Sequence, residues 1–255
     1  MSGRPPDGEP GAIVSRFVPS PNHGERRGGR RPDLLLLHYT GMPTAEMALQ
    51  RLRDPAAEVS AHYVVLEDGT VVQLVPEDRR AHHAGVSYWA GETDINSCSI
   101  GIEIVNPGHE GGLPPYPEEQ ITSVIELCRA IVDHWGIVPE RVLAHSDVAP
   151  SRKEDPGELF PWDRLAEAGI GHWVAPQPPT GEVMLQPGDT GPEVEALQDA
   201  LAFYGYSLQA SGTYDEPTRQ VVTAFQRHFR PARVDGVVDS STLATLRNLI
   251  ASRPG

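Results

Sequence analysis

Lysine is nearly absent from this sequence. Of the 21 basic side chains in its 255 residues, only Lys153 is a lysine, and all the others are arginines. Acidic residues exceed basic ones, which gives a formal net charge of −14 at pH 7. Nucleic-acid binding requires a basic surface that neutralises phosphate groups, so this charge balance argues against nucleic acid as a partner.

Long apolar runs and cysteines are scarce as well. No hydrophobic run approaches the ~20 residues that span a membrane, so the sequence predicts no transmembrane segment. The N-terminus lacks the apolar stretch of a secretory signal, which favours a cytoplasmic location. A missing leader or another export route, which would place the chain in the periplasm or cell envelope, stays open. The two cysteines, Cys98 and Cys128, are too few for a disulfide framework, and their pairing is also open.

The N-terminal region is rich in proline, glycine and arginine. Residues 1–32 carry six arginines against three acidic residues, so the rest of the chain carries a net charge of −17. We expect residues 1–15 to form an irregular arm. The basic cluster at 26–31 is expected to be solvated, with a localisation or binding patch as the less favoured alternative.

Residues 16–172 combine strand signals with helix signals. Apolar segments at 34–37, 99–105 and 141–145 are typical of buried strands. Two β-rich runs joined through Asp68-Gly69 predict a hairpin.

Helices are expected at 43–52, with Pro43 in the first turn, and within 116–136, ending at Gly136. The mixture predicts an α/β fold in which helices flank a mixed central β-sheet.

The amino-acid composition changes after Trp173. Residues 173–184 are rich in proline and predict a linker. Beyond it, 212–218 and 236–242 share the pattern G-x-x-D-x-x-T, and each aspartate is expected to cap the helix that follows. With a further helix at 191–205, residues 185–252 are predicted to form a small all-α domain of three helices.

His38, His145 and Asp155 are the candidates for a metal site. Each histidine ends a predicted strand, so both can project from one edge of the sheet, and Asp155 follows in a loop flanked by proline. Two imidazoles and one carboxylate suit Zn²⁺ with an open fourth position, which is the arrangement of a catalytic site. The alternative is that these histidines are structural or surface residues.

Glu103 lies in a predicted strand that is otherwise rich in Ile and Val. A buried, unpaired carboxylate is costly, and Glu is uncommon in strands. Alternation places Ile100, Ile102 and Ile104 on one face and Glu103 on the other. Glu103 is therefore either a general base or an exposed or arginine-paired side chain.

The segments LLLLHYTGM, SAHYVV, RAHHAG, SIGIEIVN and AHSDVAPSRKEDPGELFPW occur here in the order found in zinc-dependent N-acetylmuramoyl-L-alanine amidases of the amidase-2 type. The resemblance covers about residues 16–172. The C-terminal repeat resembles a peptidoglycan-binding domain, a combination found in the AmiD-like subgroup.

The resemblance implies one Zn²⁺ per chain, held by His38, His145 and Asp155. It implies that Glu103 is the catalytic acid/base and Lys153 a catalytic lysine. Positions implied to line or support the substrate cleft are His62, His83, Tyr39 and Asn106. The family commonly has tryptophan where this chain has His82, which puts the packing of substrate near residue 82 in doubt.

The implied reaction is hydrolysis of the amide between N-acetylmuramic acid, or its 1,6-anhydro form, and L-alanine of the stem peptide, in cell-wall turnover. The implied partners are peptidoglycan and muropeptides. A non-catalytic peptidoglycan-recognition protein, a cytoplasmic recycling amidase and a zinc peptidase that cuts within the stem peptide are the alternatives. The sequence leaves the oligomeric state and the substrate preference open.

Overall fold

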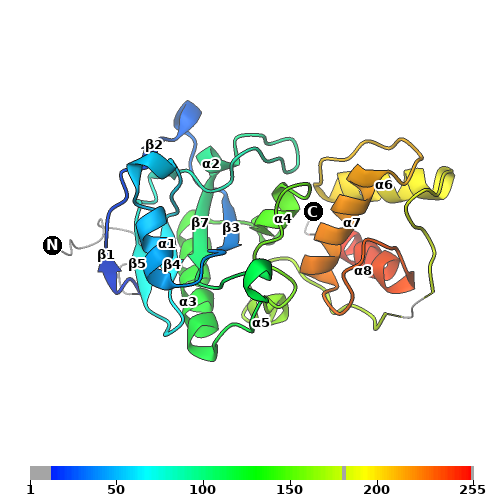
Figure 1. Ribbon diagram of the computed structural model, residues 1–255. Helices are drawn as coiled ribbons and strands as arrows, with labels where there is room; N and C mark the ends of the chain where they lie inside the picture. Colours follow the sequence, from blue (N-terminus) through cyan, green and yellow to red (C-terminus); the bar gives the residue numbers. More distant parts are fainter. Residues whose placement is uncertain (1–12, 180–181, 254–255) are drawn as a thin grey trace.

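The computed structural model describes residues 13–179 and 182–253 (Figure 1). Residues 13–173, the sheet region, form a mixed β-sheet with helices on its faces, and residues 182–253, the helical region, contain three α-helices beside it. The predicted fold class is confirmed. Most of the expected arm, residues 1–12, lies outside the described residues.

The central sheet has six strands in the order β1-β5-β4-β7-β3-β8. β4 and β5 form the predicted antiparallel hairpin, and the remaining neighbours are parallel. The strands are β1 Arg16–Phe17, β3 Leu34–Tyr39, β4 Tyr63–Val65, β5 Val71–Gln73, β7 Ser99–Ile104 and β8 Val142–Ala144, and a separate antiparallel pair is formed by β2 His23–Glu25 and β6 Arg79–Ala81.

Each face of the sheet packs against different elements. Ile100, Ile102 and Ile104 of β7 point to one face, where they meet the apolar side of α3 (Glu118–Trp135). Glu103 points to the opposite face, as alternation predicts, and so does His38, its register partner on β3. The sheet region further contains α1 Ala45–Arg51, α2 Ile95–Cys98, α4 His145–Val148 and α5 Trp162–Glu167, with 3-10 turns at Arg27–Gly29, Pro55–Ala57, His109–Gly111 and Pro139–Arg141.

Local sequence signals set most element boundaries. α3 ends where Gly136 takes a φ of 67°, a left-handed conformation that glycine adopts without a Cβ clash. α1 begins after Thr44, whose hydroxyl accepts from the Met47 N–H, so Pro43 precedes the helix instead of lying in its first turn. β3 continues through His38, so that histidine lies within the strand, whereas His145 directly follows β8 as predicted and is the first residue of α4.

The helical region consists of α6 Pro192–Tyr204, α7 Glu216–Phe229 and α8 Ser240–Ala251. Asp215 accepts from the Thr218 N–H and Asp239 from the Thr242 N–H, so both repeat aspartates cap their helices as predicted. Residues 180–181 of the expected linker lie outside the described residues.

The basic cluster at 26–31 is only partly solvated. Arg26 is buried, and its guanidinium donates to the main-chain carbonyls of Glu77, Ser97 and Ser99. The prediction of a solvated arm is therefore wrong for Arg26, because three carbonyls supply the partners that a buried guanidinium needs. Cys98 and Cys128 are both buried and free, so the two do not pair.

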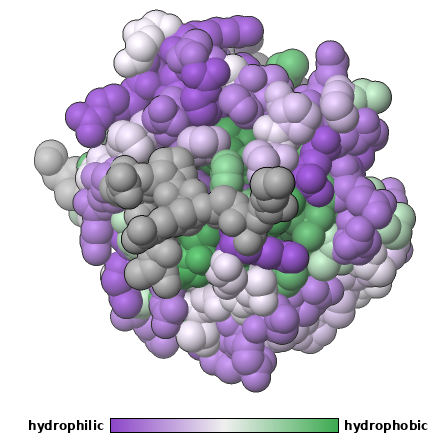
Figure 2. All heavy atoms as spheres, turned by 90° about the vertical axis from the view of Figure 1, so that its left-hand side faces the viewer, coloured by the Kyte–Doolittle hydropathy of each residue, from purple (hydrophilic) through white to green (hydrophobic). Residues whose placement is uncertain are grey.

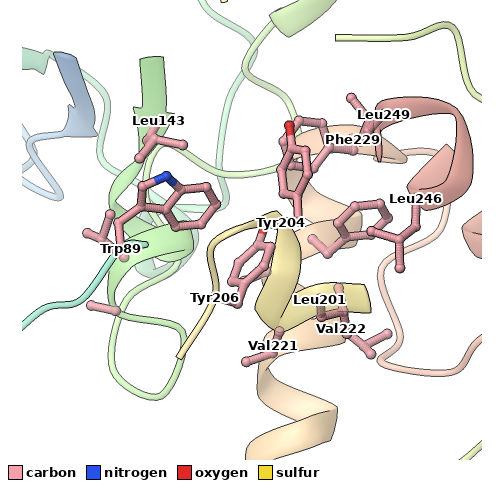
Figure 3. Close-up of a cluster of buried hydrophobic side chains, with 14 of the residues drawn as sticks. Trp89, Leu143, Leu201, Tyr204, Tyr206, Val221, Val222, Phe229, Leu246 and Leu249 are labelled. Carbon is pink, nitrogen blue, oxygen red and sulfur yellow. The ribbon is translucent and has the colours of Figure 1, made fainter. Parts of the chain in front are cut away.

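One apolar cluster joins the two regions. In Figure 3, Trp89 and Leu143 of the sheet region face Tyr204 and Tyr206 of the helical region. The opposite end of the molecule is mostly hydrophilic (Figure 2). Within residues 13–179 and 182–253, none of the helices combines the length and the apolar character that a membrane span requires.

Candidate active site

A cavity of about 470 Å³ opens at one edge of the sheet. His38 and Glu103 face it from neighbouring strands, and His145 enters it from the start of α4, directly after β8. Lys153 and Asp155 reach it from the loop that follows α4. The structure thus gathers the candidate metal ligands and both candidate catalytic residues in one cavity.

Three donor atoms converge inside the cavity. His38 Nδ1 lies 2.9 Å from His145 Nδ1 and 3.0 Å from Asp155 Oδ2, and His145 Nδ1 lies 2.9 Å from the same carboxylate oxygen. All three side chains are buried. Such crowding of potential acceptor atoms requires a proton or a metal cation between them.

The hydrogen bonds of His145 fix its tautomer. Its Nε2 lies 3.0 Å from the Ala84 carbonyl oxygen, which can only accept. Nε2 therefore carries a proton, which leaves Nδ1 as the nitrogen that can bind a cation beside His38 and Asp155. An imidazole whose second nitrogen donates to a carbonyl is the usual arrangement around a metal ligand.

A longer chain of contacts fixes the tautomer of His38. The Ser99 hydroxyl donates to the Ile95 carbonyl oxygen at 2.6 Å, so it accepts from His83 Nε2 at 3.2 Å. His83 Nδ1 then accepts from His38 Nε2 at 3.0 Å. The lone pair of His38 Nδ1 is left facing the centre of the three donors.

The environment keeps these donors ready to bind a cation. Burial, reinforced by the neighbouring His145, lowers the pKa of His38 to about 4, so its imidazole is neutral near pH 7. Burial alone would raise the pKa of Asp155, but a proton on Nδ1 of His145 or His38 would attract its carboxylate and outweigh burial, which holds that pKa well below its ordinary value.

Glu103 is the unusual acid of the cavity. Its Oε2 is buried and has no hydrogen-bond partner within the described ranges. Burial, and then repulsion from Asp155, raises its pKa well above the ordinary value, while Lys153 acts in the opposite direction. A carboxylate in such a place is a stronger base than one in water, which suits proton transfer.

The loop after α4 positions Lys153 and Asp155. The Ser146 N–H donates to the Asp155 carbonyl oxygen at 3.0 Å, and the Lys153 N–H donates to the Ala149 carbonyl oxygen at 3.0 Å. The far end of the loop is fixed by Phe160 and Trp162, which are both buried.

The four residues implied to line or support the substrate cleft separate into two pairs. Tyr39 and His83 line the cavity. His62 is fully buried away from the cavity lining, where its Nδ1 accepts from the Gly101 N–H at 2.9 Å. Asn106 is also buried off the lining and accepts from the Gly108 N–H. His62 and Asn106 therefore lie behind the cavity and hold its main chain, which corresponds to a supporting position.

His109 and Arg152 also line the cavity, although the sequence did not predict them as site residues. His109 lies 3.0 Å from Glu158 Oε2 and 3.1 Å from the Tyr39 hydroxyl, and the hydrogen bond with Glu158 raises its pKa. Arg152 donates to the carbonyl oxygens of Ala84 and Val86. The glycine-rich segment that follows the Glu103 strand was the available signal for His109.

The chain matches known protein families and curated proteins over most of its length. Residues 28–158 match the family described as N-acetylmuramoyl-L-alanine amidase, and residues 190–246 match a peptidoglycan binding domain family. The chain is 38% identical over 232 residues to the N-acetylmuramoyl-L-alanine amidase AmiD of Escherichia coli K12, across 86% of this chain and 83% of AmiD. The chain belongs to the N-acetylmuramoyl-L-alanine amidase family.

Other members of the amidase family match as well. The 1,6-anhydro-N-acetylmuramyl-L-alanine amidase AmpD of Enterobacter cloacae is 34% identical over 171 residues, across 60% of this chain and 89% of AmpD. The crystal structure of AmpDh3 from Pseudomonas aeruginosa in complex with anhydromuramic pentapeptide superposes with a TM-score of 0.75 at 33% identity, covering 90% of this chain and 95% of AmpDh3.

The structure of E. coli AmiD with anhydro-N-acetylmuramic acid-L-Ala-D-gamma-Glu-L-Lys superposes with a TM-score of 0.74 at 37% identity. That match covers 87% of this amidase and 89% of the AmiD chain, so it includes both regions of the fold. His82 also lies on the cavity wall.

Proposed function

We propose that this amidase hydrolyses the amide bond between the lactyl group of N-acetylmuramic acid, or its 1,6-anhydro form, and L-alanine of the stem peptide. The proposal rests on one observation above all: His38, His145 and Asp155 converge beside Glu103 and Lys153 in the cavity of a chain that belongs to this family. The substrates are peptidoglycan and its muropeptides, in cell-wall turnover and recycling.

We further propose that His38, His145 and Asp155 hold one Zn²⁺. Two neutral imidazole nitrogens and a carboxylate oxygen are donors that zinc prefers, and three protein donors leave one coordination position open. Each imidazole has its second nitrogen engaged, by Ala84 and by His83, as expected around zinc. When bound, zinc acidifies water and polarises a carbonyl group.

Glu103 and Lys153 are proposed to carry the proton and charge chemistry. Glu103 takes a proton from the attacking water as the water oxygen bonds to the amide carbon, and it delivers that proton to the nitrogen as the C–N bond breaks. Lys153 supplies a positive charge to the carbonyl oxygen as it becomes negative. A compact ammonium group suits a single oxygen, whereas the planar fork of arginine suits bidentate partners.

We propose the domain boundaries 16–172 for the catalytic domain and 185–252 for the peptidoglycan-binding domain, with an arm at 1–15 and a linker at 173–184. The second domain is proposed to hold polymer near the cavity and so to raise its effective concentration. Loss of binding to insoluble peptidoglycan, with small muropeptides still cleaved, is the expected result of substitutions on its exposed surface.

The experiment that tests the function is turnover of anhydro-N-acetylmuramyl-tripeptide by the full chain. We expect release of free tripeptide, loss of that release after treatment with a chelator, and recovery on adding zinc. Binding without release would favour the non-catalytic recognition protein. Release that continues after metal removal would contradict the zinc site.

A further inference from the structure

We infer that the helical region holds residues 144–156, the metal-binding loop, in place through Asp147. Asp147, Tyr206 and His228 are then positioning residues for the amidase reaction. This inference rests on the proposed function of His145 and Asp155 as metal ligands. It gives the second domain a role beyond retaining polymer, because the active site then depends on contacts that only the helical region provides.

Asp147 is the link between the two regions. Its side chain is fully buried within α4, two residues after His145. Oδ2 accepts from the Ala144 N–H at 2.8 Å, which satisfies a free amide at the start of the helix. The Tyr206 hydroxyl donates to Oδ1 at 2.7 Å, and His228 Nδ1 lies 2.7 Å from Oδ2. The carboxylate that fixes the main chain around His145 is therefore held by two side chains of the helical region.

The helical region contacts the same loop at a second point. Arg227, the neighbour of His228 on α7, pairs with Glu154 at 2.6 Å. Glu154 lies between Lys153 and Asp155, and the Asp155 carbonyl oxygen accepts from the Ser146 N–H at the start of α4. The helical region thus contacts the metal-binding loop near both ends, at Asp147 and at Glu154.

Aromatic packing makes this attachment rigid. His228 stacks on Trp162 with ring centroids 3.7 Å apart, and Tyr206 meets Trp89 edge to face at 4.9 Å. The Ala90 N–H donates to the Gly205 carbonyl oxygen at 2.8 Å, and a Cβ at Gly205 would lie 2.6 Å from the Trp89 ring. Contacts this close leave the helical region little freedom to slide over α4.

Burial explains why Asp147 depends on its partners. Removing one donor from a fully buried carboxylate leaves an oxygen unsatisfied, and the side chain then relaxes towards other partners. Any such movement shifts the Ala144–His145 backbone and with it the Nδ1 atom of His145. Changes outside the direct ligand set of a metal site commonly lower metal affinity in this way.

Two tyrosines offer a matched test. Tyr206→Phe removes the hydroxyl that bonds Asp147, whereas Tyr204→Phe removes one that lies 3.0 Å from His172 Nδ1. Both tyrosines are buried in the helical region and both bonds cross to the sheet region, but only the first reaches α4. The full-length variants are compared by zinc affinity in competition with a chromogenic chelator, by kcat and KM on the tripeptide substrate, and by amide hydrogen exchange.

We expect Tyr206→Phe to weaken zinc affinity by about tenfold, to lower kcat more than KM is changed, and to speed exchange at residues 144–156. Tyr204→Phe is expected to leave zinc affinity and exchange in that loop as in the parent chain. Equal effects of the two substitutions on zinc affinity and loop exchange would overturn the inference and leave the interface a purely stabilising role.

Arg227→Met provides a second test if Tyr206→Phe folds poorly, because it removes the contact with Glu154 from the edge of the interface. It should also speed loop exchange and weaken zinc binding. Unchanged values for both would count against the inference. A parent chain that binds no zinc would refute the proposed function instead, and the exchange measurement would still decide whether the helical region restrains the loop.

Discussion

Glu103→Gln is the substitution that separates chemistry from metal binding most cleanly. The amide keeps the size of the side chain but cannot accept a proton at neutral pH. Glu103 is not among the three converging donor atoms, so zinc content should be unchanged. General acid–base groups contribute about 10²–10⁴-fold to rate, which corresponds to about 3–5 kcal/mol of activation free energy.

The structure places Glu103 toward the upper end of that range. Its carboxylate is partly unpaired and has a raised pKa, so it is a better base than an ordinary carboxylate at the same pH. We therefore expect kcat to fall about 10³–10⁴-fold. Stability should change by less than about 1 kcal/mol, because one buried unpaired polar atom replaces another.

The assay follows release of tripeptide from anhydro-N-acetylmuramyl-tripeptide, alongside zinc content and thermal unfolding. Glu126→Gln on the exposed face of α3 is the matched control and should behave as the parent chain. Near-normal turnover by Glu103→Gln with full zinc occupancy would remove Glu103 from the mechanism. Loss of zinc in that variant would show that Glu103 acts on the metal site instead.

Three further predictions concern the same cavity. Lys153→Arg keeps the charge but should lower kcat about 10²-fold or more, since a planar guanidinium replaces a compact ammonium, and full activity would contradict the proposed role. Gly101→Ala places a Cβ 2.5 Å from the His83 ring and should lower both melting temperature and zinc affinity, whereas Gly24→Ala, with open space around it, should do neither. Burial lowers the pKa of His38 in the folded protein to about 4, below its ordinary value of 6.5, so folding favours the neutral ring. The free energy of unfolding of the metal-free protein should therefore decrease as pH falls from 6.5 towards 4. An NMR titration of the His38 ring in the metal-free protein should therefore have its midpoint well below pH 6.5, and a midpoint near 6.5 would contradict that pKa.

Local patterns predicted the elements that carry the site. Alternation in β7 placed Glu103 on the face of the sheet opposite to that of its three isoleucines. The four consecutive leucines before His38 predicted a strand that is buried on both faces. The repeat aspartates predicted two helix starts in the helical region because their hydrogen bonds form within three residues. Signals of this kind depend on neighbours along the chain, which the sequence displays directly.

Contacts between distant segments had no such signal. Asp147 forms hydrogen bonds with Tyr206 and His228, which lie 59 and 81 residues away along the chain. No local sequence pattern around these residues indicates that they pair. Arg26 looked like one solvated arginine among several, since its carbonyl partners belong to segments 51 to 73 residues away. The burial of His62 and Asn106 behind the cavity was likewise decided by packing across the sheet.

Hydrolysis in water enriched with oxygen-18 tests the central claim most directly. The full chain is incubated with anhydro-N-acetylmuramyl-tripeptide, the products are separated, and their masses are measured by mass spectrometry. Cleavage of the muramyl–L-alanine amide places the heavy oxygen in the lactyl carboxylate of the sugar product and leaves the released tripeptide unlabelled. Cleavage within the stem peptide would instead leave L-alanine on the sugar and place the label in the new C-terminal carboxylate of that sugar-linked fragment. Such a product would identify a peptidase and contradict the account.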